Sequence, residues 1–339
     1  MILVVGGTGR LGGNVVRMLR QARAEVRCLI RSGSEYYWLN DTGAGYFFGD
    51  LRNALSMRRA ARGCDYVIHA GGVRVESTDN HHGVVTLEGS KALIDASVEA
   101  GVKHFVYLSC HGVSAPDGVV EFEFRAEVEA YLQASGLSYS ILRPTVFAAE
   151  FTDIVKAESD PLAAVFSNGE ATVRPIARRD AAIYAIAALD HPAMKDRVVT
   201  LAGPDAMTVR EAAERAATAA GTEQPRFLSG ASLSATRRVA SLLAGKRYEN
   251  YCSRQKNLFS LDADVDATAL REAVGIPLTS YDAAVADALA ESHPSQDPTA
   301  RDTRVVHRQF QATVYEPGEI AAEELPDGPV RLSDAELNG

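Results

Sequence analysis

The sequence predicts an α/β protein with a doubly wound parallel sheet, a smaller C-terminal lobe and an acidic C-terminal tail. Three observations carry this prediction. Short apolar runs alternate with amphipathic stretches over the first 145 residues, the pattern of strand and helix units in a parallel sheet. A glycine-rich turn directly follows the first apolar run. The negative charge of the chain is concentrated at its C-terminal end.

The composition limits the class of protein. With 339 residues, 46% hydrophobic and 23% charged, the chain is long enough to bury a full core. The longest wholly apolar stretch, Ala181–Leu189, is less than half of the roughly 20 residues that a membrane span needs. The N-terminus lacks the basic residues of a secretory leader, so we expect a cytoplasmic protein without a membrane partner. The net charge of −9 disfavours nucleic acid as a partner.

The four cysteines favour no metal site. They are widely spaced, form no CxxC pair, and predict separate reduced thiols: Cys28, Cys64, Cys110 and Cys252.

Three regions divide the chain. Residues 1–150 predict a dinucleotide-binding region, and residues 151–290 a smaller substrate lobe that also contributes a strand and a helix to the main fold. Residues 291–339 hold ten acidic and four basic side chains, a charge of −6. This acidic tail is a candidate contact for a partner subunit or for a second copy of the chain.

Six candidate strands precede residue 145. They are Met1–Val5, Glu25–Ile30, Gly45–Phe48, Tyr66–Ala70, His104–Leu108 and Ser138–Leu142. Apolar residues recur at helical spacing in two of the intervening stretches: Leu87, Ile94 and Val98, then Phe124, Val128, Tyr131 and Leu132. Later in the chain, Arg197–Leu201 predicts a strand, and Thr208 with Glu211 predicts a helix N-terminus.

The glycine turn indicates a nucleotide site. Gly6, Gly9 and Gly12 form G-x-x-G-x-x-G between the first strand and a helix that starts near Leu11. Such a turn lets backbone N–H groups approach a pyrophosphate closely, while the helix N-terminus adds partial positive charge. Taken alone, the triplet also fits an ordinary tight turn.

The end of the second strand favours NADP(H) over NAD(H). An NAD site usually has Asp or Glu there, whereas this chain has Arg31 and no carboxylate before Glu35. A planar guanidinium suits the 2′-phosphate of NADP(H), and Thr8 and Arg10 of the glycine turn are further candidates for the same phosphate pocket. The alternative is that Arg31 is a solvated strand end.

Five ordered motifs carry a family resemblance. They are VVGGTGRLGG at the N-terminus, GDL at 49–51, GCDYVIHAGG at 63–72, AGVKHFVYLS at 100–109 and SGLSYSILRPTVF at 135–147. Together they resemble an atypical short-chain dehydrogenase/reductase of the NmrA-like, isoflavone-reductase-like branch, over roughly residues 1–290. The acidic tail matches no part of that family.

The resemblance implies a Rossmann-like sheet and assigns cofactor contacts. Asp50 and Leu51 would lie near the adenine, and Ala70, Gly71 and Gly72 along the ribose and nicotinamide. The residues that would line the nicotinamide are Pro144, Thr145, Val146 and Phe147.

The catalytic positions of the wider superfamily are substituted. Typical members carry Ser, Tyr and Lys, the last two being four residues apart. Here Arg125 stands at the lysine, Glu121 at the tyrosine, and Ser109 or Cys110 at the serine. An i,i+4 ion pair between Glu121 and Arg125 is the simpler interpretation, and a buried general acid or base at Glu121 is the alternative. Cys110 is either a nucleophile or a small buried thiol.

Histidines add further candidates. His111 follows the fifth strand, where the loops of a parallel sheet form active sites, and its titration range suits proton transfer. The alternative is a surface histidine. We expect His81 and His82 to lie in a solvent-exposed loop, and His69 and His104 to be packing residues.

Three functions remain open. The first is an NADP(H)-dependent oxidoreductase that reduces a carbonyl or a conjugated alkene in a small organic substrate. The second is a non-catalytic NADP(H)-binding redox sensor or assembly factor. The third, a nucleotide-sugar epimerase or dehydratase, is weakened because such enzymes keep the Tyr and Lys that this chain lacks.

Overall fold

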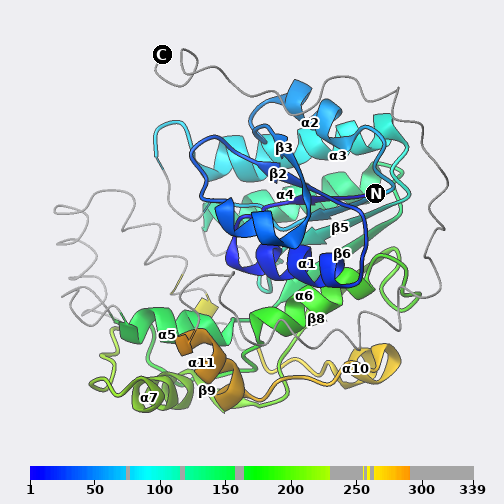
Figure 1. Ribbon diagram of the computed structural model, residues 1–339. Helices are drawn as coiled ribbons and strands as arrows, with labels where there is room; N and C mark the ends of the chain where they lie inside the picture. Colours follow the sequence, from blue (N-terminus) through cyan, green and yellow to red (C-terminus); the bar gives the residue numbers. More distant parts are fainter. Residues whose placement is uncertain are drawn as a thin grey trace.

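The computed structural model describes residues 1–73, 77–114, 119–156, 164–229, 255, 258–259 and 263–290, without the side chain of Trp38. Cys252 and the acidic tail, with its expected partner contact, lie outside these residues. Within the described residues a seven-stranded sheet forms the centre of the molecule (Figure 1). None of the helices in this part of the chain has the length and apolar character that a membrane span requires.

All neighbouring strands of the sheet are parallel. In spatial order they are β3 (Gly45–Phe48), β2 (Val26–Ile30), β1 (Ile2–Val5), β4 (Tyr66–His69), β5 (His104–Leu108), β6 (Tyr139–Pro144) and β8 (Arg197–Leu201). The six predicted N-terminal strands and the predicted strand Arg197–Leu201 are confirmed. The strand order reverses between β1 and β4. Open parallel sheets bind ligands at the carboxyl ends of the strands beside such a reversal.

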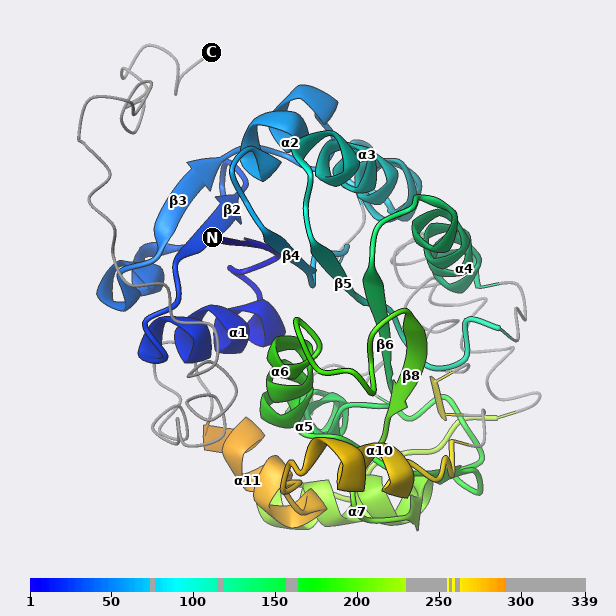
Figure 2. The same ribbon diagram turned by 90° about the vertical axis from the view of Figure 1, so that its right-hand side faces the viewer.

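Helices cover both faces of the sheet (Figure 2). On one face, α1 (Arg10–Gln21) packs against α6 (Arg178–Ala187), which is buried from Asp180 to its end. On the other face lie α2 (Ala54–Ala61), α3 (Ser90–Ala100) and α4 (Val120–Ala134). Because every central strand is covered on both sides, its residues are almost continuously apolar.

Two details of the helix predictions are wrong. The stretch in which Leu87, Ile94 and Val98 recur at helical spacing begins as a π-helical segment, Gly83–Gly89, and becomes α-helical only at Ser90. Val98 and Tyr131 are exposed instead of buried, since they lie on the outer sides of α3 and α4. Tyr131 is held there by its hydroxyl, which donates to Asp95 at 2.7 Å.

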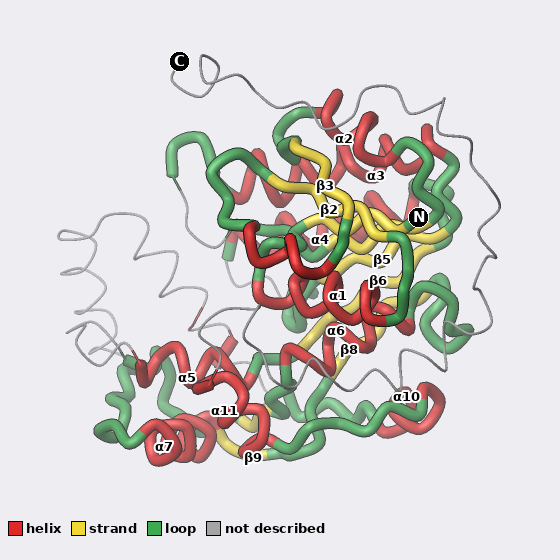
Figure 3. The backbone as a smooth tube through the Cα atoms, viewed as in Figure 1, coloured by secondary structure: helices red, strands yellow, loops and turns green. Residues whose placement is uncertain are grey.

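A second group of helices packs below the sheet in the view of Figure 3. It comprises α5 (Ala148–Lys156), α7 (Val209–Ala220) and α11 (Tyr281–Ala290), together with the short antiparallel pair β7 (Thr172–Val173) and β9 (Met207–Thr208). The predicted N-cap of α7 is confirmed, because the Thr208 hydroxyl accepts from the backbone N–H of Glu211 at 3.1 Å. A further helix, α10 (Thr268–Val274), lies near α6 and precedes α11.

One buried carboxylate ties this group to the main sheet. Asp180, in the first turn of α6, accepts from the backbone N–H of Thr279 at 2.7 Å and from its hydroxyl at 2.9 Å. Burial raises the pKa of Asp180, and the two bonds from Thr279 oppose that increase. The start of α11 is therefore fixed against α6.

Candidate functional site

The glycine turn between β1 and α1 leaves no room for a side chain at Gly6 or Gly12. A Cβ on Gly12 would lie 2.2 Å from the carbonyl oxygen of Gly6. Gly6 has φ +84°, and a Cβ there would lie 2.7 Å from the carbonyl oxygen of Ala70, at the end of β4. Gly9 is exposed and caps α1 without a side-chain hydrogen bond. The turn therefore presents bare backbone at an open helix N-terminus, as pyrophosphate binding requires.

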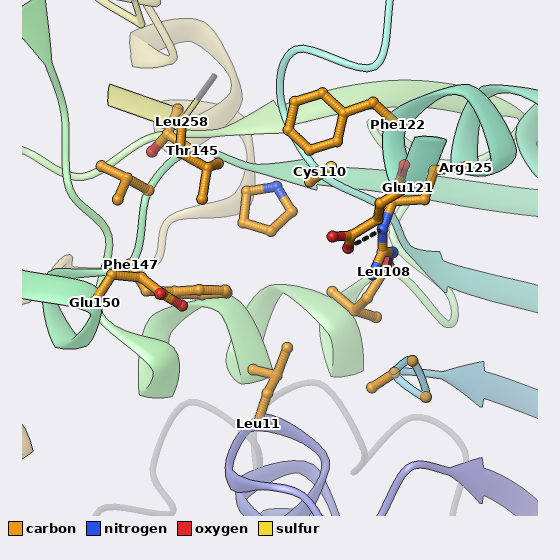
Figure 4. Close-up of a pocket in the computed structure, with 16 residues that line it drawn as sticks. Leu11, Leu108, Cys110, Glu121, Phe122, Arg125, Thr145, Phe147, Glu150 and Leu258 are labelled. Carbon is orange, nitrogen blue, oxygen red and sulfur yellow. Dashed lines mark hydrogen bonds and ion pairs between the residues drawn. The ribbon is translucent and has the colours of Figure 1, made fainter. Parts of the chain in front are cut away.

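A pocket lies at the carboxyl edge of the sheet, beside this turn (Figure 4). Its volume of about 160 Å³ is close to the space that one aromatic ring fills. Twelve residues predicted for the site line it: Leu11, Ala70, Gly71, Gly72, Ser109, Cys110, Glu121, Arg125, Pro144, Thr145, Val146 and Phe147. The expected cofactor wall and the substituted catalytic positions therefore meet in one cavity.

Four lining residues were not predicted: Leu108, Phe122, Glu150 and Leu258. Phe122 follows Glu121 on α4, and Glu150 lies in the first turn of α5, three residues after Phe147. Two of them had a sequence signal: Leu108 lies inside the motif at 100–109, and Glu150 is the first acidic residue after the motif that ends at Phe147. Leu258 comes from the C-terminal half of the chain, and no local pattern brings it to the pocket.

Ser109 presents a hydroxyl without a partner. It follows β5, its side chain is 5% exposed, and its Oγ has no hydrogen-bond partner among the described residues. Its backbone N–H donates to the carbonyl oxygen of Leu142 at 2.8 Å, which continues the pairing of β5 with β6. A buried polar atom of this kind indicates a place for a water or for a polar ligand atom.

Glu121 and Arg125 form a buried ion pair on α4. Arg125 Nε donates to Glu121 Oε1 at 3.0 Å, and Arg125 Nη1 donates to the carbonyl oxygen of Leu108 at 3.1 Å. The two side chains are only 9% and 13% exposed. The expected i,i+4 pair is therefore confirmed, and it is buried, as a general acid or base would also require. Burial lowers the pKa of Arg125, but Tyr107, Glu121 and Cys110 outweigh it and raise the pKa above its usual value. The guanidinium is a permanent cation.

His82 lies closer to the pocket than expected. Its Nε2 is 3.8 Å from Glu121 Oε2, and its side chain is 12% exposed. Its Nδ1 is 3.0 Å from the hydroxyl of Thr86, a buried residue of the π-helical segment. The prediction of a solvent-exposed loop is therefore wrong for His82, because the π-helical segment packs against α4.

His69 supports the wall formed by Ala70–Gly72. Its Nδ1 accepts from the backbone N–H of Gly71 at 3.3 Å, so Nε2 carries the proton that faces the Ser90 hydroxyl at 2.8 Å. Burial, and secondly the charge of Arg125, lowers the pKa of His69 to about 3. This histidine is a neutral packing residue, as predicted, and buried His104 is another.

The predicted adenine side is polar and charged. Arg31, at the end of β2, is exposed and donates to the Asn80 side chain at 2.6 Å. Asp50 accepts from Arg52 at 2.6 Å. Burial raises the pKa of Asp50, but hydrogen bonds from Arg52 outweigh this and lower it overall. Leu51 lies against Gly71, with its Cδ1 3.3 Å from the Cβ position there.

Three other predicted residues lie away from the pocket lining. Arg10 pairs with Asp153 of α5 at 2.9 Å, and Arg178 of α6 pairs with the same carboxylate. The Arg10 side chain therefore joins the glycine turn to α5. From the sequence we expected it to contact a phosphate. Thr8 lies in the turn, half-buried. His111 follows β5, and its backbone N–H donates to the carbonyl oxygen of Pro144 at 2.9 Å.

The described residues contain no group of His, Cys, Asp and Glu side chains that could hold a metal ion. Within the same part of the chain, Cys28, Cys64 and Cys110 form no disulfide.

A parallel sheet with a bare glycine turn after its first strand, and a pocket beside that turn, defines a dinucleotide-binding α/β protein. The chain belongs to the NmrA-like family, whose model matches residues 1–223. The resemblance seen in the sequence motifs is thereby confirmed.

The relatives of this chain include reductases and assembly factors. It is 32% identical over 222 residues to the NAD(P)H azoreductase of Xenophilus azovorans, over 65% of this chain and 74% of that protein. It is 29% identical over 206 residues to the photosystem II assembly factor Ycf39 of Trieres chinensis. That match covers 60% of this chain and 63% of the assembly factor, so less than two thirds of the latter is spanned.

Solved structures confirm the fold. The NADPH-dependent quinone oxidoreductase of Escherichia coli, complexed with NADPH, matches with a TM-score of 0.68 and 18% identity, over 84% of this chain and 98% of that one. The triphenylmethane reductase of Citrobacter sp., complexed with NADP(H), matches with a TM-score of 0.67 and 18% identity, over 85% and 99% of the two chains.

Proposed function

We propose that this chain is an NADP(H)-dependent reductase that acts on a carbonyl or a conjugated alkene in a small organic substrate. The observation that carries the proposal is the buried Ser109 hydroxyl, which has no hydrogen-bond partner among the described residues. It lies in the same pocket as the Glu121–Arg125 pair, beside the glycine turn. Relatives and similar structures named as NAD(P)H reductases support it.

The residues present fit the cofactor. The bare turn at Gly6–Gly12 and the N-terminus of α1 would hold the pyrophosphate, and Asp50 with Leu51 the adenine side. The walls Ala70–Gly72 and Pro144–Phe147 would hold the nicotinamide ribose and ring. Bound NADPH supplies the hydride, so the protein has to orient the substrate and manage one proton.

The pocket provides groups for both tasks. In our proposal the Ser109 hydroxyl donates to the substrate oxygen, and Glu121 exchanges the proton that balances the reduction. Arg125 cannot give up a proton at ordinary pH, so its role is to hold Glu121 and to provide positive charge. The apolar side chains of Leu11, Phe122 and Phe147 surround these groups and exclude water from the reacting carbon.

The test of turnover is direct. Purified protein is mixed with NADPH and a panel of ketones, quinones and enones, and the absorbance of the reduced nicotinamide is followed. We expect consumption with at least one class of acceptor. Tight NADPH binding without consumption by any acceptor would contradict a reductase.

Ser109→Ala should lower activity without lowering stability. Removing the donor to the substrate oxygen should reduce kcat/KM by about tenfold, while NADPH affinity stays within about twofold. Because Ser109 Oγ has no partner among the described residues, its loss should leave the free energy of unfolding unchanged or slightly higher. Steady-state kinetics and urea unfolding of the cofactor-free protein measure both effects. A loss of stability with normal kcat/KM would show that Ser109 is structural.

Arg31→Ala should reduce the preference for NADPH over NADH. A guanidinium on a 2′-phosphate contributes roughly tenfold in affinity, and NADH lacks that phosphate. We expect the NADPH Kd to rise by about tenfold and the NADH Kd to stay the same. Since Arg31 is exposed, Arg23→Ala, at another exposed arginine, is the matched control. An unchanged ratio of the two affinities would mean that Arg31 does not contact the phosphate.

A second candidate function is a non-catalytic NADP(H)-binding sensor or assembly factor. Two observations favour it: the tyrosine and lysine of the superfamily are replaced by Glu121 and Arg125, and relatives named as photosystem II assembly factors match over 60% of the chain. This candidate predicts nucleotide binding with no turnover, so the acceptor panel separates the two.

A further inference from the structure

We propose that His82 is a positioning residue that relays a proton between solvent and Glu121, so that the two side chains together replace the missing tyrosine of the site. This inference rests on the proposed reductase function. It concerns a histidine that the sequence placed in an exposed loop and that does not itself line the pocket.

The carboxylate of Glu121 lies between the guanidinium of Arg125 and the imidazole of His82. Arg125 Nε donates to Oε1 at 3.0 Å, and His82 Nε2 lies 3.8 Å from Oε2. The carboxylate also lines the pocket (Figure 4), so its proton can reach a bound substrate. The 3.8 Å separation is closed by a small side-chain rotation or by one bridging water.

Thr86 fixes the direction of the imidazole. The π-helical segment brings the Thr86 hydroxyl to 3.0 Å from His82 Nδ1. With the hydroxyl as donor to Nδ1, the proton of the neutral imidazole is on Nε2, which faces Glu121. π-Helical turns are uncommon and are frequent at functional sites. Here the π-helical segment holds His82 against α4.

The proton balance is simple. The pair shares one proton, which resides on His82 or on Glu121. In a reduction the substrate carbon gains a hydride, the substrate oxygen takes the shared proton from the Glu121 carboxyl, and a C–H and an O–H bond form. Glu121 is then a carboxylate beside neutral His82. Solvent protonates His82 to the imidazolium, with the Thr86 hydroxyl turning to accept from Nδ1, and the Nε2 proton passes to Glu121. The relay needs no further co-reactant beyond NADPH.

Other titratable groups surround the His82–Glu121 pair. Among the described residues these include Arg125 on α4, Tyr107 of β5, Cys110 after that strand, His69 on β4, Lys91 on α3 and Glu150 of α5, which lines the same pocket. Burial raises the pKa of Tyr107 to about 12, and burial lowers that of His69 to about 3, so both stay neutral between pH 6 and 9. Lys91 pairs with Glu127 at 2.6 Å. Cys110 and Glu150 remain, and the variants Cys110→Ser and Glu150→Gln test their contributions.

The experiment compares His82→Gln with His81→Gln, the same change at the neighbouring residue. A glutamine amide can still donate a hydrogen bond to Glu121 but cannot relay a proton. For His82→Gln we expect kcat to fall by about tenfold or more, with the acceptor KM and the NADPH Kd within about twofold of wild type. The His81→Gln variant should match wild type.

The pH profile gives the second readout. Reduction consumes a proton, so kcat falls as pH rises and the pair loses its shared proton. Without His82 the carboxyl of Glu121 must hold the proton alone, so the falling limb should move to lower pH by about one unit or more. His81→Gln should retain the wild-type limb. A limb that moves in Cys110→Ser or Glu150→Gln and stays in place in His82→Gln would assign the second proton site to that residue instead of His82.

The outcomes are distinct. If His82→Gln has the kcat and the pH profile of wild type, the relay is wrong while the reductase function stands. If His82→Gln restores what His82→Ala loses, His82 acts only as a hydrogen-bond donor and the relay is again wrong. Failure of the wild-type protein to oxidise NADPH with any acceptor would instead contradict the proposed function. Thermal unfolding of each variant with and without NADPH separates these results from misfolding.

Discussion

Gly9→Asp should abolish NADP(H) binding while leaving the fold intact. Gly9 is the N-cap of α1, it has extended backbone angles, and its Cβ position is 3.2 Å from the nearest heavy atom, the carbonyl oxygen of Gly6. Aspartate is a favoured N-cap residue, so the helix should be as stable as before or more so. A carboxylate at this position would repel a pyrophosphate bound at the same helix N-terminus. We expect the NADPH Kd to rise by at least about a hundredfold, ~3 kcal/mol.

Gly9→Asn is the matched control, since asparagine has the same shape and the same capping ability without the charge. Fluorescence titration with NADPH and urea unfolding of the cofactor-free protein measure both effects. The asparagine variant should bind NADPH more weakly than wild type by a few-fold only. Equal NADPH affinities for the aspartate and asparagine variants would mean that the pyrophosphate does not lie at this helix N-terminus.

The sheet was predictable because each strand carries its own signal. Buried parallel strands such as His104–Leu108 are mostly apolar, are buried at every position and are bounded by glycine or polar turns. The helix over Ser90–Ala100 ends where Gly101 adopts φ +71°, a stop that the sequence also marks. The π-helical start of the segment before Ser90 could not be predicted, since it depends on the packing of His82 and Thr86 against α4.

The candidate site was predictable where its residues follow strand ends. Ala70–Gly72, Ser109 and Pro144–Phe147 follow β4, β5 and β6, or lie at their ends, and parallel strands bring these ends to one edge. Leu258 is distant in sequence, and only tertiary packing brings it to the pocket. Arg10 was predicted from its place in the turn alone, because the sequence contains no sign that Asp153 would take its guanidinium.

The substituted triad has a physical consequence. In the superfamily the proton comes from the phenol of a tyrosine beside a lysine. Here Arg125 stabilises the Glu121 carboxylate as an anion, so Glu121 must be given a proton before it can act as a donor. A second titratable group next to Glu121 is therefore needed for reduction at neutral pH. His82 is the described residue that meets this requirement, at 3.8 Å from the carboxylate.

Glu129→Ala should destabilise the protein strongly without touching the pocket lining. Glu129 of α4 is 3% exposed and accepts from Arg143 of β6 through both carboxylate oxygens, at 3.0 Å and 3.2 Å from Arg143 Nε. Arg143 also donates to the Ser114 hydroxyl at 2.9 Å. Breaking one side of a buried ion pair leaves the other charge without compensation, which costs about 3 to 5 kcal/mol. Because Arg143 retains some contact with solvent, we expect about 3 kcal/mol by urea unfolding.

The double variant Glu129→Leu with Arg143→Met separates charge burial from packing. Removing both charges also removes their desolvation cost, and apolar side chains of similar volume fill the space between α4 and β6. We expect the double variant to recover most of the stability that Glu129→Ala loses, and Glu129→Gln, which keeps one acceptor oxygen, to lose about 1 to 2 kcal/mol. A double variant as unstable as Glu129→Ala would mean that the pair itself, through its bidentate geometry, aligns β6 and thereby the wall that begins at Pro144.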